Sequence, residues 1–353
     1  MTIHTFEVSA MLTNDNFYSI QDELKSNDNS KWKATKNGMA YWGLSEKGIL
    51  IHMYQIKKKD FYSYSITYRI SARRVMDNDN FVGLFDTKNY PKLENKVNEL
   101  LKDKCSLLPK LKKCSLRRID FCVNAKLDNQ DQVKAYIKIS KRANIPSKLE
   151  LYNDYDKISK RTKPTKDDYT VYSSEYIAVS IYNKYAEMKK RKEKTCSDKE
   201  FKKAKNIVRI EIRCMEGKFQ ALKKKYDIDS TEEFMISADI IGNDLYNYYL
   251  TKMFGDGIIC TLNQAVKRID MSGYKKENIE ILKEFIKDSN MSRSSAETIR
   301  EYKNIYGKTE VKRILYMLDN IDTNYVTVTN SDVKLFKDGY IPTPIELYDD
   351  FKN

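Results

Sequence analysis

The chain has 353 residues, 41% of them hydrophobic, and is therefore long enough for about two domains with a buried core. Its formal charge of +14 favours a polyanionic partner, because clustered Lys and Arg displace counterions from nucleic-acid phosphates, although a Lys-rich composition with a solvated surface gives the same charge. The six cysteines form no CxxC pair, and the chain has no signal peptide and no apolar run long enough to span a bilayer. These features argue against a structural zinc site and a membrane protein, and predict a cytoplasmic protein with reduced thiols.

The first part of the chain mixes strand and helix patterns. Apolar residues at every second position predict strands at Thr2–Ala10 (as an edge strand), Gly48–Ile56, Tyr62–Ser71, Leu116–Asn124, Tyr169–Tyr172, Tyr176–Asn183 and Ile207–Met215. The charged turn KKKDF joins the second and third of these strands into a basic hairpin. Helices are predicted from Pro91, over Gln130–Ala143 and over Lys218–Lys225, whereas the polar stretch Glu150–Asp168 is predicted to be a connector.

From Ser230 onward the pattern becomes helical. Two Ser-x-x-Glu sequences, beginning at Ser230 and Ser294, fit the capping box that starts a helix. Apolar residues between them recur at three- and four-residue spacing. We therefore predict an α+β protein with an antiparallel sheet and flanking helices in residues 1–228, followed by an all-helical domain in residues 229–353.

Four of the predicted strands carry polar residues on the face opposite their apolar side chains, namely His52, Asp120, Tyr182 and Glu211. If these strands are neighbours in one sheet, an imidazole, two carboxylates and a phenol gather on one face. Oxygen-rich clusters with one imidazole suit Mg²⁺ or Mn²⁺ acting on a phosphodiester, and a nearby tyrosine can attack the phosphorus. A structural interpretation stands beside this one, because Asp120 and Glu211 lie close to arginines with which they can form salt bridges.

The segment from Lys184 to Lys205 is strongly basic. It carries ten Lys and Arg against four Asp and Glu, a local net charge of +6. Beside a polar sheet face such a segment attracts phosphates, although a solvated helix tolerates the same charges. The tyrosines around it can stack on unpaired bases or can simply fill the sheet.

Three short motifs resemble those of one known family. RRIDFCVN (Arg117–Asn124), SIYNKYAEM (Ser180–Met188) and VRIEIRC (Val208–Cys214) follow one another as in rolling-circle replication initiators of small plasmids and phages, and in the related relaxases of integrative elements. The resemblance covers roughly residues 48–225. It implies an HUH-like endonuclease fold, in which an antiparallel sheet binds a divalent metal ion. In that family a tyrosine nicks one DNA strand at an origin and leaves a 5′-phosphotyrosine and a free 3′-OH.

The resemblance also implies a metal site. Asp120 and Glu211 would bind Mg²⁺ or Mn²⁺ or orient its ligands, and His52 would supply the histidine. Many relatives have two histidines on one strand, whereas IHMYQ supplies only His52. Either another residue, such as Gln55 or Glu211, completes the ligand set, or the chain binds DNA without cutting it.

The resemblance further implies a nucleophile and a DNA-binding surface. Tyr182 is the first choice as nucleophile, with Tyr185 and Tyr172 in reserve, and Lys184 would hold the phosphate. The predicted DNA contacts are Arg118, Lys189, Lys190, Arg191 and Arg213.

Together these observations predict a replication initiation protein of a plasmid, phage or other mobile element that nicks and rejoins one strand of origin DNA, single-stranded or cruciform. The helical domain would serve DNA binding or assembly. Further predicted partners are a host helicase or polymerase and a second copy of the chain in a homodimer. The alternative hypotheses are a non-catalytic basic DNA- or RNA-binding protein that uses the same sheet, and a structural phage or plasmid protein.

Overall fold

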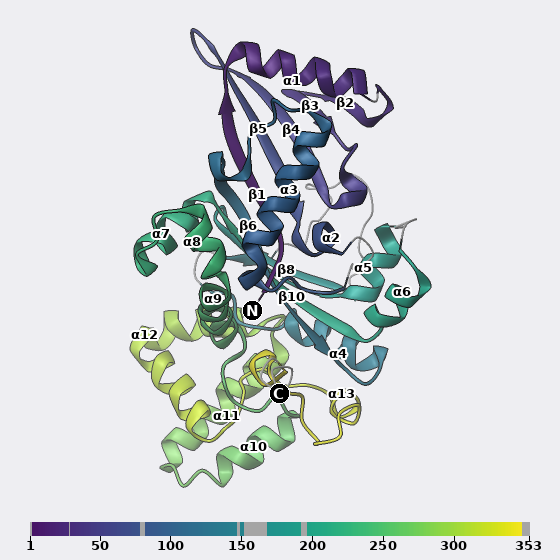
Figure 1. Cartoon of the computed structure of the whole chain (residues 1–353). Helices are drawn as coiled ribbons and strands as arrows, with labels where there is room; N and C mark the ends of the chain where they lie inside the picture. Colours follow the sequence, from purple (N-terminus) through teal and green to yellow (C-terminus); the bar gives the residue numbers. More distant parts are fainter. Residues whose placement is uncertain are drawn as a thin grey trace.

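The centre of the molecule is one large antiparallel sheet (Figure 1). The computed structural model describes residues 2–27, 29–77, 82–146, 149–151, 168–191 and 196–347. Within these residues ten strands pair in the order β2-β3-β4-β5-β1-β6-β10-β9-β8-β7. Helices flank this sheet and form the C-terminal part, which confirms the predicted α+β fold. Most of the predicted connector, residues 152–167, lies outside the described residues.

All the strands predicted from alternation are present. The strands are β1 (Thr2–Leu12), β2 (Trp32–Thr35), β3 (Gly38–Tyr41), β4 (Ile49–Lys57), β5 (Tyr62–Ser71), β6 (Ser115–Lys126), β7 (Glu150–Leu151), β8 (Tyr169–Ser173), β9 (Ile177–Asn183) and β10 (Ile207–Met215). The short strands β2, β3 and β7 were not predicted, because two to four residues offer at most two positions on either face and no alternation can be recognised.

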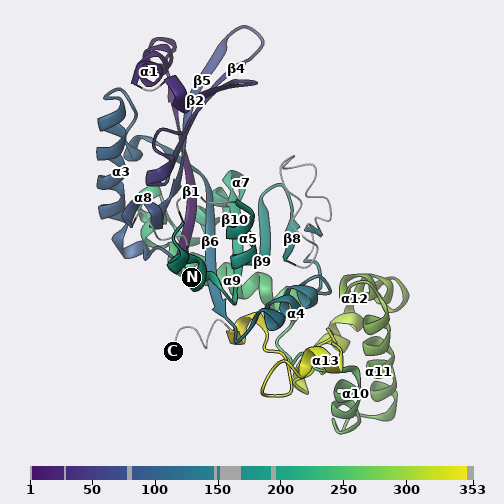
Figure 2. The same cartoon turned by 90° about the vertical axis from the view of Figure 1, so that its right-hand side faces the viewer.

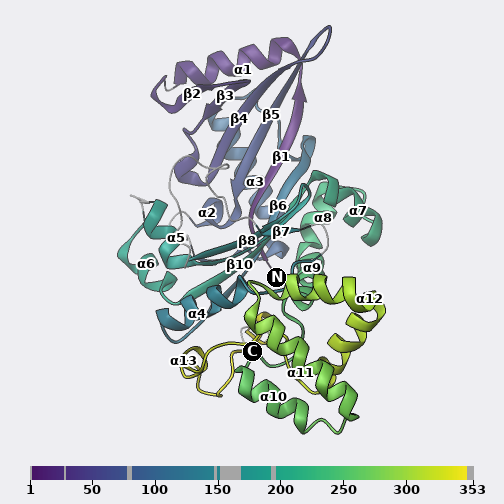
Figure 3. The same cartoon turned by 180° about the vertical axis from the view of Figure 1, so that it is seen from behind.

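The helices of the described residues are α1 (Asn14–Asn27), α2 (Ala72–Met76), α3 (Tyr90–Lys104), α4 (Gln130–Ser140), α5 (Lys184–Arg191), α6 (Asp198–Ala204), α7 (Glu216–Tyr226), α8 (Thr231–Ile236), α9 (Ala238–Phe254), α10 (Leu262–Asp270), α11 (Lys276–Met291), α12 (Ser295–Asn320) and α13 (Asn330–Val333). In this part of the chain no helix combines the length and the apolar character needed to cross a membrane. Figure 3 shows α10, α11 and α12 together at the end of the molecule opposite α1.

The two faces of the sheet differ in chemistry. One face buries apolar side chains such as Phe6, Ile66 and Phe121, all of them shielded from solvent. Figure 2 shows α1, α3 and α8 on this side, and the ring of Phe17 in α1 lies 5.0 Å from that of Tyr64 in β5. The opposite face of the central strands carries polar side chains. Because side chains alternate along a strand, the burial of one face leaves the other free to collect charged groups.

The predicted domain boundary crosses a continuous core. α8 and α9, which begin the predicted second domain, contact α3, β1 and β10 of the first. The buried apolar residues of both parts form one large cluster. The boundary between residues 228 and 229 therefore stays a prediction.

One of the two predicted capping boxes is formed. The Ser230 hydroxyl accepts the Glu233 N–H at 3.0 Å, and the Glu233 carboxylate accepts the Ser230 N–H at 3.1 Å. The prediction at Ser294 is wrong, since this fully described helix start shows no side-chain capping bond from it. The Glu297 carboxylate accepts the N–H of Arg293 at 3.3 Å instead.

The N-terminal strand β1 lies in the middle of the sheet, between β5 and β6. The predicted edge position is therefore wrong. The weak alternation of this strand has another cause, because its register with β6 shifts between Ile3 and Thr5 and again between Glu7 and Val8. Such irregularities add a residue to one strand and re-aim the side chains beside it. His4 stands at the first of these shifts.

Candidate functional site

Three of the four polar strands are neighbours in the sheet. β6, β10 and β9 lie side by side, with Asp120 opposite Arg213 and Glu211 opposite Ser180. Tyr182 stands two residues beyond Ser180 on the same strand. Residues opposite one another in antiparallel strands share a face, as do residues two apart in one strand. The structure therefore brings Asp120, Glu211 and Tyr182 together on the polar face.

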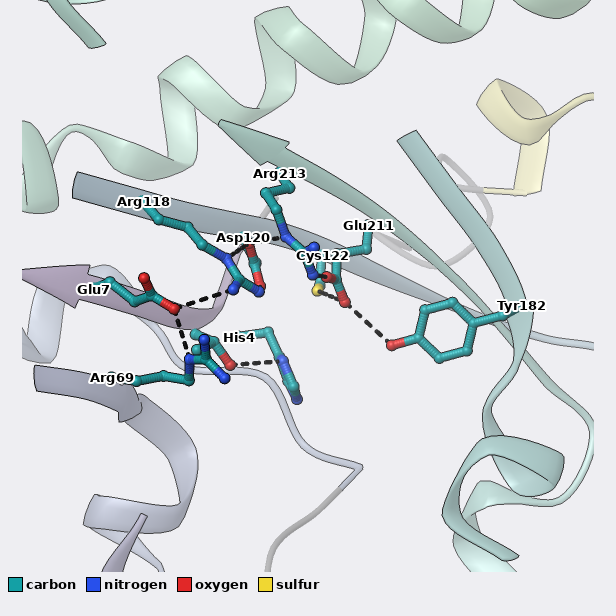
Figure 4. A network of polar contacts seen from close by, with 10 residues as sticks. His4, Glu7, Arg69, Arg118, Asp120, Cys122, Tyr182, Glu211 and Arg213 are labelled. Atoms are coloured by element: carbon teal, nitrogen blue, oxygen red, sulfur yellow. Dashed lines mark hydrogen bonds and ion pairs between the residues drawn. The ribbon is translucent and has the colours of Figure 1, made fainter. Parts of the chain in front are cut away.

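Asp120 is held by two arginines (Figure 4). Its side chain is 2% exposed, and it accepts hydrogen bonds from Arg118 Nε at 2.8 Å and Arg118 Nη2 at 2.5 Å. Arg213 Nε donates a third bond at 3.0 Å. The same arginines reach further carboxylates, Arg118 to Glu7 at 3.1 Å and Arg213 to Glu211 at 3.2 Å. The salt bridges considered for Asp120 from the sequence are thus present.

The two carboxylates of this network differ in acidity. Burial acts to raise the pKa of Asp120, but the attraction of Arg213 and the hydrogen bonds from Arg118 outweigh it and hold the pKa below its usual value. Burial also raises the pKa of Glu211, and here the neighbouring Asp120 charge adds to the increase. Neighbouring carboxylates whose pKa values move apart suit different roles. Asp120 stays ionised, whereas Glu211 is suited to take up and release a proton.

Tyr182 contacts one of these carboxylates through its hydroxyl group. Its hydroxyl donates to Glu211 Oε2 at 3.1 Å, and 6% of the residue is exposed. Burial raises the pKa of Tyr182 well above its usual value, and the Glu211 charge raises it further. The phenol is therefore neutral near pH 7, and the carboxylate that could remove its proton already accepts its hydrogen bond.

The reserve tyrosines point elsewhere. Tyr172 lies on the apolar side of β8, where its hydroxyl donates to the carbonyl of Ser140 in α4 at 2.5 Å. Tyr185 lies on α5 and packs edge-on against Phe201 of α6, with 6.3 Å between the ring centres. Of the three tyrosines considered from the sequence, Tyr182 alone has its hydroxyl at the carboxylates.

His4 is a residue of this site that sequence reasoning missed. Potential ligand atoms of His4, Cys122 and Glu211 all lie within 4.8 Å of one another. The His4 ring also contacts the Thr5 hydroxyl, at 3.0 Å from Nδ1. The missed signal was the three-residue gap between the buried residues Ile3 and Phe6, since strict alternation would space them by two or four.

His52 does not join this group. It lies on β4, and β5 and β1 separate that strand from β6. His52 is opposite Thr67, and Thr67 is opposite Ser9 of β1. Asp120 is opposite Thr5 of β1, so the two residues are offset by four positions along the strands. These offsets correspond to about 13 Å along the strands and about 14 Å across them. The predicted meeting of His52 with Asp120 and Glu211 at one ion is therefore not seen, because β1 inserts between the hairpin and β6.

The residues present fit some metal ions better than others. The oxygens of Asp120 and of Glu211 all accept hydrogen bonds from neighbouring side chains, but the group of converging ligand atoms contains His4 and Glu211 and not Asp120, so these two are the candidate pair of ligands. Burial, followed by the Glu211 charge, raises the pKa of the Cys122 thiol well above its usual value, so it is a poor ligand for a hard ion. An imidazole beside a carboxylate suits Mn²⁺, whereas Mg²⁺ prefers oxygen ligands alone. The donor set thus fits Mn²⁺ better than Mg²⁺.

The predicted phosphate-binding residues differ in accessibility. Lys184 is 3% exposed and its ammonium contacts Glu187 at 2.8 Å, so it lies inside the molecule. Lys190 lies 3.8 Å from Asp168, and Lys189 is exposed on α5. Arg191 ends α5, and its side chain lies outside the described part. Among the arginines, Arg118 has 14% of its side chain exposed and Arg213 has 37%, so Arg213 is the more accessible to a phosphate.

The loop before α3 borders the polar face beside Tyr182. The fully buried Arg209, which is opposite Tyr182, donates to the carbonyl of Val82 at 2.6 Å. Asn124 donates to the same carbonyl at 2.9 Å. Val82 belongs to a small second apolar cluster that also contains Met188 of α5. The tyrosine thus lies beside a packed loop and helix rather than on an open surface.

Comparison with protein families gives a single clear result. The model of the Phage CRI family, described as the N-terminal domain of a replication-associated protein, matches residues 3–235. This range contains all of the sheet except Thr2, and all the residues of the site. No curated protein and no solved structure matches the chain significantly.

Proposed function

Because the chain belongs to the Phage CRI family of replication-associated proteins, we propose that it nicks and rejoins one strand of origin DNA through Tyr182. Membership of this family confirms the predicted resemblance to replication initiators and implies that the chain acts on DNA. The covalent tyrosine chemistry and the metal ion are the parts that we propose. The observation that supports them best is the 3.1 Å hydrogen bond from the Tyr182 hydroxyl to Glu211.

In the proposed reaction Glu211 accepts the hydroxyl proton of Tyr182, and the phenolate oxygen attacks the phosphorus. A bond forms between this oxygen and phosphorus, and the bond from phosphorus to the 3′ oxygen breaks. The 3′ oxygen takes up a proton and leaves as a free 3′-OH, while the 5′ phosphate remains on Tyr182. The reverse attack by a 3′-OH rejoins the strand, since the phosphotyrosine ester keeps the energy of the broken bond.

Two charged groups prepare this face for a phosphate. Arg213 is partly exposed and lies between Asp120 and Glu211, so it can face a phosphate oxygen while it keeps Glu211 in position. Asp120 holds Arg118 and Arg213 in place through its three hydrogen bonds. Preorganised donors of this kind stabilise charge that develops on the transferring group.

We further propose that His4 and Glu211 hold a Mn²⁺ ion, with Cys122 beside them. When bound, such an ion neutralises non-bridging phosphate oxygens and orients the phosphodiester. Mn²⁺ binding to the purified protein, followed by the electron paramagnetic resonance signal of free Mn²⁺, tests this assignment without DNA. We expect His4→Ala and Glu211→Gln to weaken binding at least tenfold and His52→Ala to leave it unchanged. Equal losses in all three variants would contradict the assignment.

The covalent step has its own test. The substrate is a tiled set of single-stranded oligonucleotides that covers both strands of the DNA flanking the gene, incubated with Mn²⁺. We expect a covalent protein–DNA adduct on one oligonucleotide, its absence in Tyr182→Phe, and its retention in the matched variant Tyr185→Phe. An adduct that persists in Tyr182→Phe would show that another residue is the nucleophile.

DNA binding without cleavage is the second candidate function. The burial of Tyr182 favours it, because a phosphate reaches the hydroxyl only if the neighbouring loop and helix move. This function predicts salt-sensitive binding that is indifferent to Mn²⁺ and to Tyr182→Phe, with no adduct on any oligonucleotide. Roles for a helicase, a polymerase or a homodimer remain predictions from the sequence.

A further inference from the structure

The hairpin that joins β4 and β5 projects from the far end of the sheet. Figures 1 and 2 show it extending beyond α1, away from β8 and β10. Residues 56–62 are all exposed, and we refer to them as the hairpin tip. A turn bond from the Lys58 N–H to the Phe61 carbonyl, at 2.8 Å, closes the tip. The tip is therefore an ordered turn that holds its side chains out into solvent.

Large apolar side chains gather at this tip. Phe61 is 61% exposed, Tyr62 48% and Ile56 47%, and Met11 at the adjoining end of β1 is 65% exposed. Isolated exposed apolar residues are ordinary, but a group at the end of a projecting hairpin indicates a binding surface. At this position no other part of the described fold covers these side chains, so they are available to a partner.

The charge of the tip indicates which partner it takes. Lys57, Lys58 and Lys59 precede the two aromatic residues, against the single acidic residue Asp60. The Lys58 ammonium lies 5.6 Å from the centre of the Phe61 ring. Lysines beside exposed aromatic rings are the combination with which proteins bind unpaired nucleic acid, through phosphate pairing and base stacking.

The strand β5 joins the tip to the proposed active face, although the Tyr62 ring itself lies on the α1 side of the sheet, 6.4 Å from the ring of Tyr64. Along β5 the strand runs from Tyr62 to Arg69, seven residues or about 23 Å. Arg69, which has 47% of its side chain exposed, donates to Glu7 at 2.6 Å. Glu7 in turn accepts from Arg118 of the Asp120 network. A strand of DNA that follows this face from the network to the tip spans at most about seven nucleotides at the ~3.4 Å rise of a stacked strand.

From these observations we propose that the hairpin tip binds single-stranded DNA in the flank of the nicked site, with bases stacked on Phe61 and Tyr62 and phosphates paired with the three lysines. This inference rests on the proposed function, because it takes the strand at Tyr182 as its starting point. Stacking requires unpaired bases, so the tip discriminates single strands from duplex of equal length. It contributes to affinity and to the choice of strand, and it takes no part in the chemistry.

The test uses full-length protein in the Tyr182→Phe background, so that only binding is measured. The aromatic tip variant carries Phe61→Ser and Tyr62→Ser, and the lysine tip variant carries Lys57→Ala, Lys58→Ala and Lys59→Ala. The matched control carries Lys110→Ala, Lys112→Ala and Lys113→Ala, which removes three exposed lysines on the α3 side. Fluorescence anisotropy measures the affinity for oligonucleotides that extend 3 or 15 nucleotides from the nicked position, on each side in turn.

We expect wild-type protein to bind the long flank on one side about tenfold more tightly than the short one, and both tip variants to lose this gain. The lysine variant should also lower the salt slope of single-strand binding by about 2, since each phosphate pair contributes about 0.7. The control variant should keep the length effect. The proposal is overturned if the tip variants keep the length effect, or if their affinity falls equally for duplex and for single-stranded DNA.

The outcome does not depend on the covalent chemistry. If no oligonucleotide is nicked, the one in the tiled set that binds most tightly defines the site instead. The difference in affinity between its long and short flanks still tests the tip. Loss of the adduct with an intact length effect refutes the proposed function alone. An intact adduct without a length effect refutes the tip alone.

Discussion

Removal of the Asp120 charge should destabilise the centre of the sheet by about 3 kcal/mol at pH 7. Asp120→Asn keeps the size of the side chain but removes the negative charge on which three charge-assisted hydrogen bonds depend, and it replaces one of the two acceptor oxygens by an NH2 group. Loss of one partner of a buried ion pair costs roughly 3–5 kcal/mol. The lower end applies because Arg118 keeps Glu7, Arg213 keeps Glu211, and the Arg213 side chain is 37% exposed.

The pH dependence of this loss follows from the lowered pKa of Asp120. Such a group stabilises the folded state above its unfolded pKa, near 3.8, and the contribution is lost as the pH falls through the folded value. The difference between wild type and Asp120→Asn should therefore be full at pH 7 and shrink below pH 3.8. Removing both partners in an Arg118→Met and Asp120→Asn double variant should cost less than the two single changes together.

Urea unfolding followed by circular dichroism measures these differences. The control is Asp131→Asn, because the Asp131 side chain is 71% exposed and forms a surface ion pair with Lys134 at 3.5 Å. We expect the control to change the free energy of unfolding by less than about 0.5 kcal/mol. A loss below about 1 kcal/mol for Asp120→Asn, or a loss that is equal at pH 7 and below pH 3.8, would refute the view that Asp120 holds the network.

Two further predictions concern the C-terminal part. Burial raises the pKa of Asp319 to about 6, so the stability that this group contributes below pH 3.8 is lost as the pH rises through about 6. Asp319→Asn should therefore stabilise the protein at pH 7 by about 1 kcal/mol, a value discounted because the carboxyl is partly exposed to solvent. Denaturant titrations should show this gain at pH 7 and not at pH 4. Ser230→Ala should cost about 1 kcal/mol because it removes a formed capping box, whereas Ser294→Ala should cost much less; thermal unfolding that ranks the two in the opposite order would contradict the capping geometry.

The sequence was sufficient to predict the strands and their polar faces. Alternation alone identified the strands that carry Asp120, Tyr182 and Glu211, and the motifs around them predicted a family that the match over residues 3–235 confirms. This succeeds because the period of two in a strand is a local property, so a few consecutive residues decide which side chains share a face. Capping is equally local, and Ser230 shows it, although Ser294 shows that a matching pattern does not ensure the bonds.

Only the tertiary structure decided which strands are neighbours, and this choice changed the site. Local patterns predicted β1 at an edge, yet it lies between β5 and β6, where its register shift brings His4 to Cys122 and Glu211 and leaves His52 three strands away from Asp120. The same pairing set Tyr182, rather than Tyr172 or Tyr185, beside a carboxylate. The physical reason is that strand pairing is a long-range choice made by packing and backbone hydrogen bonds between segments distant in sequence, and no local periodicity records it.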